Sequence, residues 1–155
     1  MTDLVLRHDE GGVCTLTLNR PDQRNAVNRA LFRAFRDHVQ AIESDGDAIG
    51  IVVITGAGDH FCAGHDLKAP PHADALGWLR QELLILERLT RLRQPVIAVV
   101  RGTCYTGGLE FALTADMIVA GQSARFADTH GKWGLVPGWG LSQRLPRRVG
   151  QAKAL

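Results

Sequence analysis

The stretch 102–110, GTCYTGGLE, follows the apolar run VIAVV at 96–100 and decides the interpretation of the fold. A second glycine-bearing stretch, FCAGHDL at 61–67, follows another apolar run, IVVIT at 51–55. Uninterrupted apolar runs of this length are typical of strands buried on both faces. Each glycine-rich turn therefore follows a buried strand, and one backbone N–H from each turn can bind the same negatively charged oxygen. Such paired donors form an oxyanion hole, often the largest single contribution to acyl chemistry.

The rest of the chain alternates between strand-like and helix-like patterns. Residues 13–18 alternate apolar and polar side chains, which predicts a half-buried strand paired with 4–6 through the turn at 10–12. Asn25 or Asn28 is suited to cap the helix that follows. Helices are expected at about 28–43, 75–92 and 107–115, with short strands at 117–120 and 125–127. This order predicts an α/β fold in one domain, 1–155.

The two ends of the helix at 75–92 are marked by stiff segments. Pro70-Pro71 is expected to stiffen the end of the loop before it, and Gln94-Pro95 stops it. A further helix begins at 151–155, where the apolar face has nothing within the sequence to cover it. A missing C-terminal segment or a partner chain is therefore expected to complete the core.

Composition and charge exclude several classes of protein. The net charge is +2 and no stretch interleaves aromatic with basic residues, so we expect no nucleic-acid partner. No apolar run approaches the length that crosses a membrane, and the N-terminus does not resemble a signal peptide. The three cysteines, Cys14, Cys62 and Cys104, are expected to be buried thiols in a reducing compartment. These features predict a cytoplasmic location.

Glu110 follows Gly107-Gly108 by one helical turn and is the first candidate for proton transfer. The N-terminus of the helix offers free N–H groups, and glycines allow a substrate to approach the backbone. A partly buried carboxylate beside that space can move protons. Taken alone, Glu110 is better explained as a surface residue that supports the helix dipole.

The sequence gives weaker support for two other kinds of site, a dinucleotide-binding loop and a metal site. Gly56-Ala57-Gly58 resembles a dinucleotide loop but lacks its third glycine, because Phe61 stands there. Metal-binding side chains also gather in this loop, at a spacing that matches no familiar site. We therefore expect no metal and interpret these residues as ordinary polar loop residues: Asp59, His60, Cys62, His65 and Asp66.

Taken together, the motifs resemble the crotonase family, the enoyl-CoA hydratase/isomerase superfamily, over essentially the whole chain. The residues that carry the resemblance are NRP at 19–21, NA at 25–26, FCAGHDLK at 61–68, GGLEFA at 107–112 with AD at 115–116, and GLVPG at 134–138. The resemblance implies a spiral of repeated β-β-α units. It also implies trimers, often stacked as hexamers, and a C-terminal helical part that is absent from 1–155.

The same resemblance implies acyl-CoA thioesters as substrates, in reactions such as those of fatty acid metabolism. The backbone N–H groups of His65 and Gly107 would form the oxyanion hole and stabilise a thioester enolate. No separate cofactor is expected, because coenzyme A is part of the substrate. The implied CoA-binding residues are Arg24, Ala26, Ala63, Asp66, Leu67 and Lys68. Lys68 is either a cation for the nucleotide phosphates or a solvated loop lysine.

In hydratases of this family two glutamates hold and activate a water molecule. Glu110 matches the first, whereas the position of the second is occupied by His130, with Asp128 in reserve as a carboxylate. His130 is either a proton carrier or a residue of the pocket wall. Enoyl-CoA hydration is the leading hypothesis. The alternatives are double-bond isomerisation, which needs a single carboxylate, and a non-catalytic module that binds CoA esters.

Large apolar side chains near these residues are expected to pack. Trp133 and Trp139 flank the His130 segment and are interpreted as packing residues. Leu76, Leu79 and Leu83 are interpreted as core rather than as the wall of an acyl tunnel.

Overall fold

The computed structural model describes residues 3–45, 47–69 and 74–154. The loop end at Pro70-Pro71 lies outside the described residues. The main sheet has five strands in the order β1-β2-β3-β4-β6, with β1 antiparallel to β2 and the other neighbours parallel. Its strands are β1 Val5–Glu10, β2 Val13–Leu18, β3 Ile51–Gly56, β4 Val96–Val100 and β6 Met117–Ala120. The expected hairpin is confirmed, and both apolar runs are strands. Each is fully buried on one face only, because alternate residues of β3 and β4 are partly exposed.

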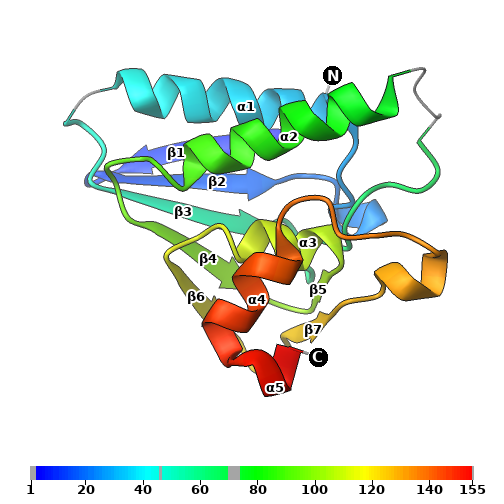
Figure 1. Cartoon of the computed structure of the whole chain (residues 1–155). Helices are drawn as coiled ribbons and strands as arrows, with labels where there is room; N and C mark the ends of the chain where they lie inside the picture. Colours follow the sequence, from blue (N-terminus) through cyan, green and yellow to red (C-terminus); the bar gives the residue numbers. More distant parts are fainter. Residues whose placement is uncertain (1–2, 46, 70–73, 155) are drawn as a thin grey trace.

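Two long helices, α1 Arg29–Ser44 and α2 Ala75–Leu89, lie side by side over the sheet (Figure 1). The side chain of Asn28 caps α1 by accepting a hydrogen bond from the Leu31 N–H at 2.9 Å. Asn25, the alternative cap, is instead fully buried and donates to the carbonyl oxygens of Ala57 and His60. Asn25 therefore ties the loop before α1 to the loop after β3.

A second, smaller sheet lies beside the main sheet and has two strands. β5 Thr103–Tyr105 pairs in parallel with β7 Arg125–Ala127. Two isolated β-bridges, which are backbone pairings, extend this smaller sheet on the other side. One joins Cys62 to Cys104 and the other joins Val27 to His65. β1-β2-α1, β4-β5-α3 and β6-β7-α4 each follow the β-β-α order, which confirms the expected crotonase-like fold. The remaining elements are η1 Pro21–Gln23, α3 Gly107–Ala112, η2 His130–Trp133, α4 Leu141–Val149 and α5 Gln151–Ala154.

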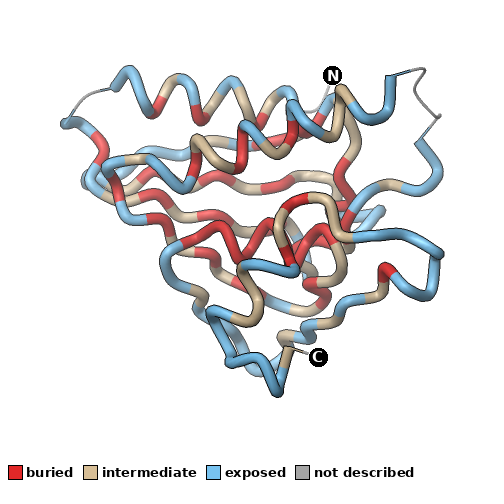
Figure 2. The backbone as a smooth tube through the Cα atoms, in the orientation of Figure 1, coloured by how far each residue is buried: buried red, intermediate tan, exposed pale blue. Residues whose placement is uncertain are grey.

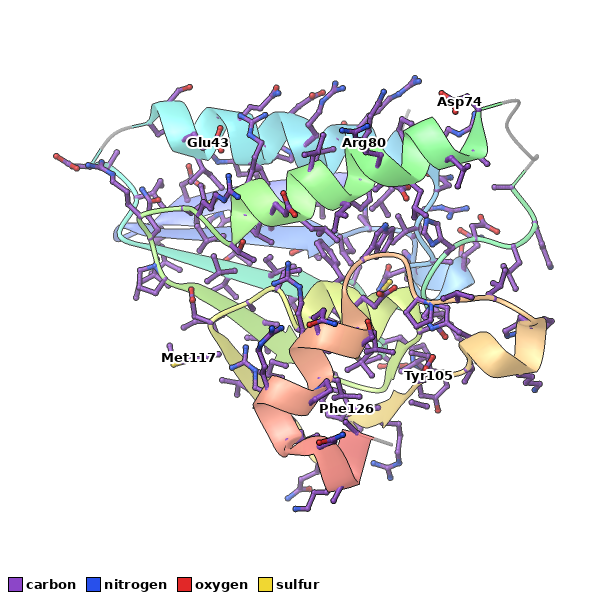
Figure 3. The ribbon with its side chains drawn as sticks, viewed as in Figure 1. Glu43, Asp74, Arg80, Tyr105, Met117 and Phe126 are labelled. Atoms are coloured by element: carbon purple, nitrogen blue, oxygen red, sulfur yellow. The ribbon has the colours of Figure 1, made fainter. Side chains whose placement is uncertain are left out.

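Burial is concentrated in the central strands and α3, whereas α4, α5 and the chain around η2 are largely exposed (Figure 2). No residue from Gln151 to Ala154 in α5 is buried. Met117 projects from β6 at the outer edge of the sheet and is 50% exposed (Figure 3). None of the described helices is long and apolar enough to span a membrane.

Several expectations about packing need correction. Trp133 is 56% exposed and Leu76 is 81% exposed, so neither packs in the core as expected. Leu76 lies in the first turn of α2, whereas the buried residues of that helix begin only at Glu82. Trp139, in contrast, is completely buried as expected. The helix that begins at Gly107 ends three residues earlier than expected, at Ala112.

All three cysteines are free and buried, as expected. Burial raises the pKa of the Cys62 thiol from 9.0 to about 12, and burial also raises the pKa of Cys104. A thiol whose pKa is higher in the folded state than in the unfolded state stabilises the folded state at pH values below the unfolded pKa. This stabilisation is lost as the pH rises from the unfolded pKa through the folded pKa. We therefore expect the free energy of unfolding in urea to fall between about pH 8 and pH 10.5, by about 2 kcal/mol for Cys62 alone.

The matched control for this prediction is Cys62→Ala, measured over the same pH range. Its unfolding free energy should fall less steeply with pH than that of the unchanged chain. Equal slopes in the two proteins would show that Cys62 does not carry the effect.

Candidate active site

The His65 N–H is directed by the bridge to Val27. The carbonyl oxygen of Gly64 accepts from the Val27 N–H at 2.8 Å, and the Asp66 N–H donates to the Val27 carbonyl at 2.8 Å. The Gly64 carbonyl and the His65 N–H belong to one trans peptide, so they point in opposite directions. The His65 N–H therefore points away from Val27. Gly64 permits this turn because its φ is +99°, in a region that side chains rarely adopt.

The Gly107 N–H starts α3 and lies opposite the Gly64–His65 peptide. A Cβ placed on Gly64 would lie 3.1 Å from the Gly107 nitrogen, and one on Gly107 would lie 3.5 Å from the His65 nitrogen. Within the part of the chain that the structure describes, neither nitrogen donates a hydrogen bond. The structure therefore brings together the two amides that the sequence singled out, and glycine keeps the space between them open.

Glu110 follows Gly107 by three residues in α3 and is buried rather than exposed at a helix surface. Its side chain is 2% exposed, and its Oε1 accepts from the N–H groups of Trp139 at 2.7 Å and Leu141 at 3.0 Å. The other oxygen, Oε2, lies 3.6 Å from Nε2 of His130. The surface interpretation of Glu110 is therefore wrong. One oxygen is fixed by the backbone, which leaves Oε2 to exchange a proton.

His130 lies at the start of η2 with its side chain 8% exposed. Its Nδ1 lies 2.6 Å from Oδ1 of Asp128, and the same oxygen accepts from the His130 N–H at 3.0 Å. A carboxylate only accepts hydrogen bonds, so Nδ1 carries a proton and Nε2 faces Glu110. Asp128, the reserve carboxylate, thus orients the imidazole and contacts Glu110 only through it. The three side chains form a line: Asp128, His130, Glu110.

Glu82 is a residue of the site that our reading of the sequence missed. It projects from α2, is 1% exposed, and its Oε2 accepts from Nε1 of Trp139 at 3.2 Å. The same oxygen lies 3.0 Å from Nε2 of His65. The helical phase is the signal that could have found it, because position 82 lies three residues after Leu79 and four before Leu86. A carboxylate on that apolar face needs a polar partner.

The predicted CoA-binding residues come from two segments that pair with each other. The Ala63 N–H donates to the Arg24 carbonyl at 3.0 Å. Arg20 donates to the Ala26 carbonyl at 2.6 Å and to the Asp66 carboxylate at 2.9 Å. The Asp66 carboxylate also accepts from the Lys68 N–H at 3.1 Å. Asp66 therefore shapes the loop through its side chain.

A hollow of about 410 Å³ opens beside these residues. Its lining includes two of the predicted residues, Asp66 and Lys68, together with Arg29, which the sequence did not single out. Leu67 is 56% exposed at the same loop, and Arg24 is also exposed. Lys68 and Arg29 place two cationic side chains at one hollow, an arrangement suited to phosphate groups. Its other lining residues are Asn28, Ala30 and Ala69.

Three of the five side chains of metal-binding type in the loop at 59–66 make structural contacts instead. Nδ1 of His60 accepts from the Thr103 N–H at 3.1 Å, and the Cys62 sulfur accepts from the Gly64 N–H at 3.4 Å. Asp66 pairs with Arg20. Among the residues that the structure describes, no three metal-ligating side chains gather at one point.

Comparison with known proteins gives the family. The model of the family described as enoyl-CoA hydratase/isomerase matches residues 8–155. A 2,3-dehydroadipyl-CoA hydratase of Escherichia coli (strain K12) is 38% identical over an alignment of 155 positions, which covers 99% of this chain and 60% of the relative. A 1,2-epoxyphenylacetyl-CoA isomerase of the same organism is 37% identical over 162 residues, covering 100% of this chain and 62% of the relative.

Solved structures agree. The crystal structure of an enoyl-CoA hydratase from Mycobacterium avium has a TM-score of 0.80 and 43% identity, covering 97% of this chain and 62% of that one. That of an enoyl-CoA hydratase from Bacillus anthracis has a TM-score of 0.89 at 32% identity, with 97% and 60% covered. The chain spans about 60% of the length of the curated relatives that it matches. Its motifs, fold and relatives agree, and the chain belongs to the enoyl-CoA hydratase/isomerase family, the crotonase superfamily.

Proposed function

We propose that this chain acts on an acyl-CoA thioester whose carbonyl oxygen binds between the N–H groups of His65 and Gly107. The observation that carries this proposal is the proximity of the two free amides across Gly64 and Gly107. Negative charge moves onto the carbonyl oxygen when the thioester becomes an enolate. Two fixed donors stabilise that charge most strongly after it has formed, and each is worth roughly 3 kcal/mol.

The reaction that we propose first is hydration of a 2-enoyl-CoA. Nε2 of His130 accepts a proton from water, the hydroxyl oxygen bonds to Cβ, and the electrons of the double bond move to the thioester oxygen. Oε2 of Glu110 then supplies a proton to Cα as the enolate collapses. The product gains one water in total, and the enzyme regains its state when the proton passes from His130 to Glu110. The 3.6 Å separation of these two groups supports that return step.

Isomerisation of a double bond is the second candidate, and one observation favours it. Two backbone N–H groups hold Oε1 of Glu110, so Oε2 alone is left for proton transfer, and its neighbour is an imidazole rather than the second glutamate typical of hydratases. A single carboxylate can remove a proton from one carbon and return it to another through the enolate. Following crotonyl-CoA against a 3-enoyl-CoA separates the two reactions. Binding of both esters with turnover of neither would support a non-catalytic module.

The proposal also covers where CoA lies, the need for cofactors, the assembly and the location of the protein. CoA is expected to lie along Arg24, Ala26, Ala63 and Leu67, with its phosphates near Lys68, and no metal or separate cofactor is needed by the steps above. A homotrimer or hexamer, and a cytoplasmic location, stay predictions from the sequence. Sedimentation of the purified chain tests the assembly.

His130→Ala tests the second proton carrier. We expect turnover of crotonyl-CoA to fall by about 10²-fold or more, because proton transfer by a positioned group typically contributes on this order. The Michaelis constant should change little. His8→Ala is the control, because that imidazole is 74% exposed on β1. A raised Michaelis constant with unchanged turnover would instead place His130 in the pocket wall.

A further inference from the structure

Glu82 is a buried carboxylate that the proposed chemistry does not use. Both of its described hydrogen bonds end on one oxygen, Oε2, which contacts Nε2 of His65 at 3.0 Å and Nε1 of Trp139 at 3.2 Å. Oε1 is buried, with no partner among the described residues. A buried carboxylate costs folding free energy unless it is well paired, and only one of the two oxygens of Glu82 is paired. Packing alone therefore does not account for a glutamate here.

Each partner of Glu82 belongs to one side of the candidate site. His65 contributes one of the two facing amides, and its ring lies 4.3 Å from the ring of Trp139. Trp139 donates its backbone N–H to Glu110, and its ring would lie 3.1 Å from a Cβ on Gly107. Oε2 of Glu82 therefore contacts both His65, which carries one amide, and Trp139, whose ring lies against Gly107, the residue that carries the other amide.

The contact between Glu82 and His65 also fixes which nitrogen of the His65 imidazole carries a proton. Because a carboxylate accepts and does not donate, Nε2 of His65 carries a proton and Nδ1 is left for other contacts. The side chain of His65 is 38% exposed, so the ring held by Glu82 is partly open to solvent.

We propose that Glu82 is a positioning residue, which holds the His65 ring and the Trp139 indole in place and thereby aligns the two amides with Glu110. This inference rests on the proposed function, since it concerns the same site. Glu82 contacts no reacting atom and acts through His65 and Trp139. We expect the loss of this positioning to cost on the order of 10-fold to 100-fold in activity, the size of effect seen when the partner that orients a metal-binding side chain is removed.

The test compares Glu82→Met, which removes the acceptor at similar volume, with Glu82→Gln, which keeps one carbonyl acceptor. We expect Glu82→Met to lower kcat on the active ester by about 10-fold to 100-fold with little change in KM. The melting temperature should also fall, because the buried indole N–H of Trp139 loses its acceptor. Glu82→Gln should restore most of that loss. Glu87→Met on the same helix is the matched control and should leave kcat unchanged. Full kcat in Glu82→Met would overturn the proposal.

A double-mutant cycle shows whether Glu82 acts through the imidazole. His65→Ala keeps the backbone N–H and deletes the ring, so Glu82→Met should lower kcat by a smaller factor in that background than in the unchanged chain. Equal factors in the two backgrounds would contradict action through His65.

A readout independent of turnover separates this proposal from the proposed function. The ¹⁵N shifts of the His65 ring should report a proton on Nε2 in the unchanged chain and a mixture of both tautomers in Glu82→Met. If the chain turns over no ester, these shifts still test the role of Glu82. Identical ring shifts in the two proteins would overturn it.

Discussion

Glu110→Gln should lower turnover of the active enoyl-CoA ester by about 10²-fold to 10⁴-fold, the usual contribution of a positioned acid or base. A glutamine can still accept the hydrogen bonds that Oε1 receives from Trp139 and Leu141, so the pocket should keep its shape. It cannot donate or receive the proton at Oε2. Loss of the ester's conjugated absorbance gives the rate, and calorimetry should show that the CoA ester still binds.

Glu43→Gln is the control for this change. Glu43 pairs with Arg88 at the surface, far along the sequence from the candidate site, so its neutralisation should leave turnover as it was. If Glu110→Gln also turned over the ester at the unchanged rate, Glu110 would have no part in proton transfer.

Gly64→Ala should have a comparably large effect for a steric reason. The added Cβ would lie 3.1 Å from the Gly107 nitrogen and 3.1 Å from the Tyr105 carbonyl oxygen, within the space between the two amides. We expect turnover to fall by about 10²-fold to 10³-fold, as when one oxyanion donor is removed. The φ of +99° at this position adds backbone strain of about 1–3 kcal/mol, which a urea titration measures.

Gly131→Ala separates the steric effect from a general cost of replacing glycine. A Cβ on Gly131 meets no described atom within 4 Å, and its φ is not in the left-handed region. This variant should keep both its stability and its turnover. Unimpaired turnover in Gly64→Ala, measured on protein that is shown to be folded, would mean that the space between the amides is not where the thioester binds.

The sequence predicted the strands whose apolar pattern is visible locally. Alternation at 13–18 and continuous apolar runs at 51–54 and 96–100 depend on local patterns, and all three are strands. The glycines at 64 and 107 were informative because backbone approach demands them. The resemblance to the crotonase family pointed to His65, Gly107, Glu110 and His130. The structure brings the first two together as neighbouring amides and the last two together as neighbouring side chains.

What the sequence did not predict depends on contacts between distant segments. Glu82 and Trp139 lie 57 positions apart, and nothing local indicates that they share a hydrogen bond. Leu76 follows the same periodicity as Leu86, yet only Leu86 has chain packed against it. The sequence predicts that Trp133, which flanks the His130 segment, packs, whereas η2 leaves it 56% exposed. Periodicity identifies a helix face and cannot say how far along the helix that face is covered.

The most direct test of the central claim is the carbonyl stretching frequency of a bound acyl-CoA thioester, measured by difference infrared spectroscopy with a ¹³C-labelled carbonyl. Two converging N–H donors should polarise the bond and lower its frequency below that of the free ester in water, and Gly64→Ala should abolish the shift. A bound carbonyl that absorbs at the same frequency as the free ester would contradict the claim that the His65 and Gly107 amides share one oxygen.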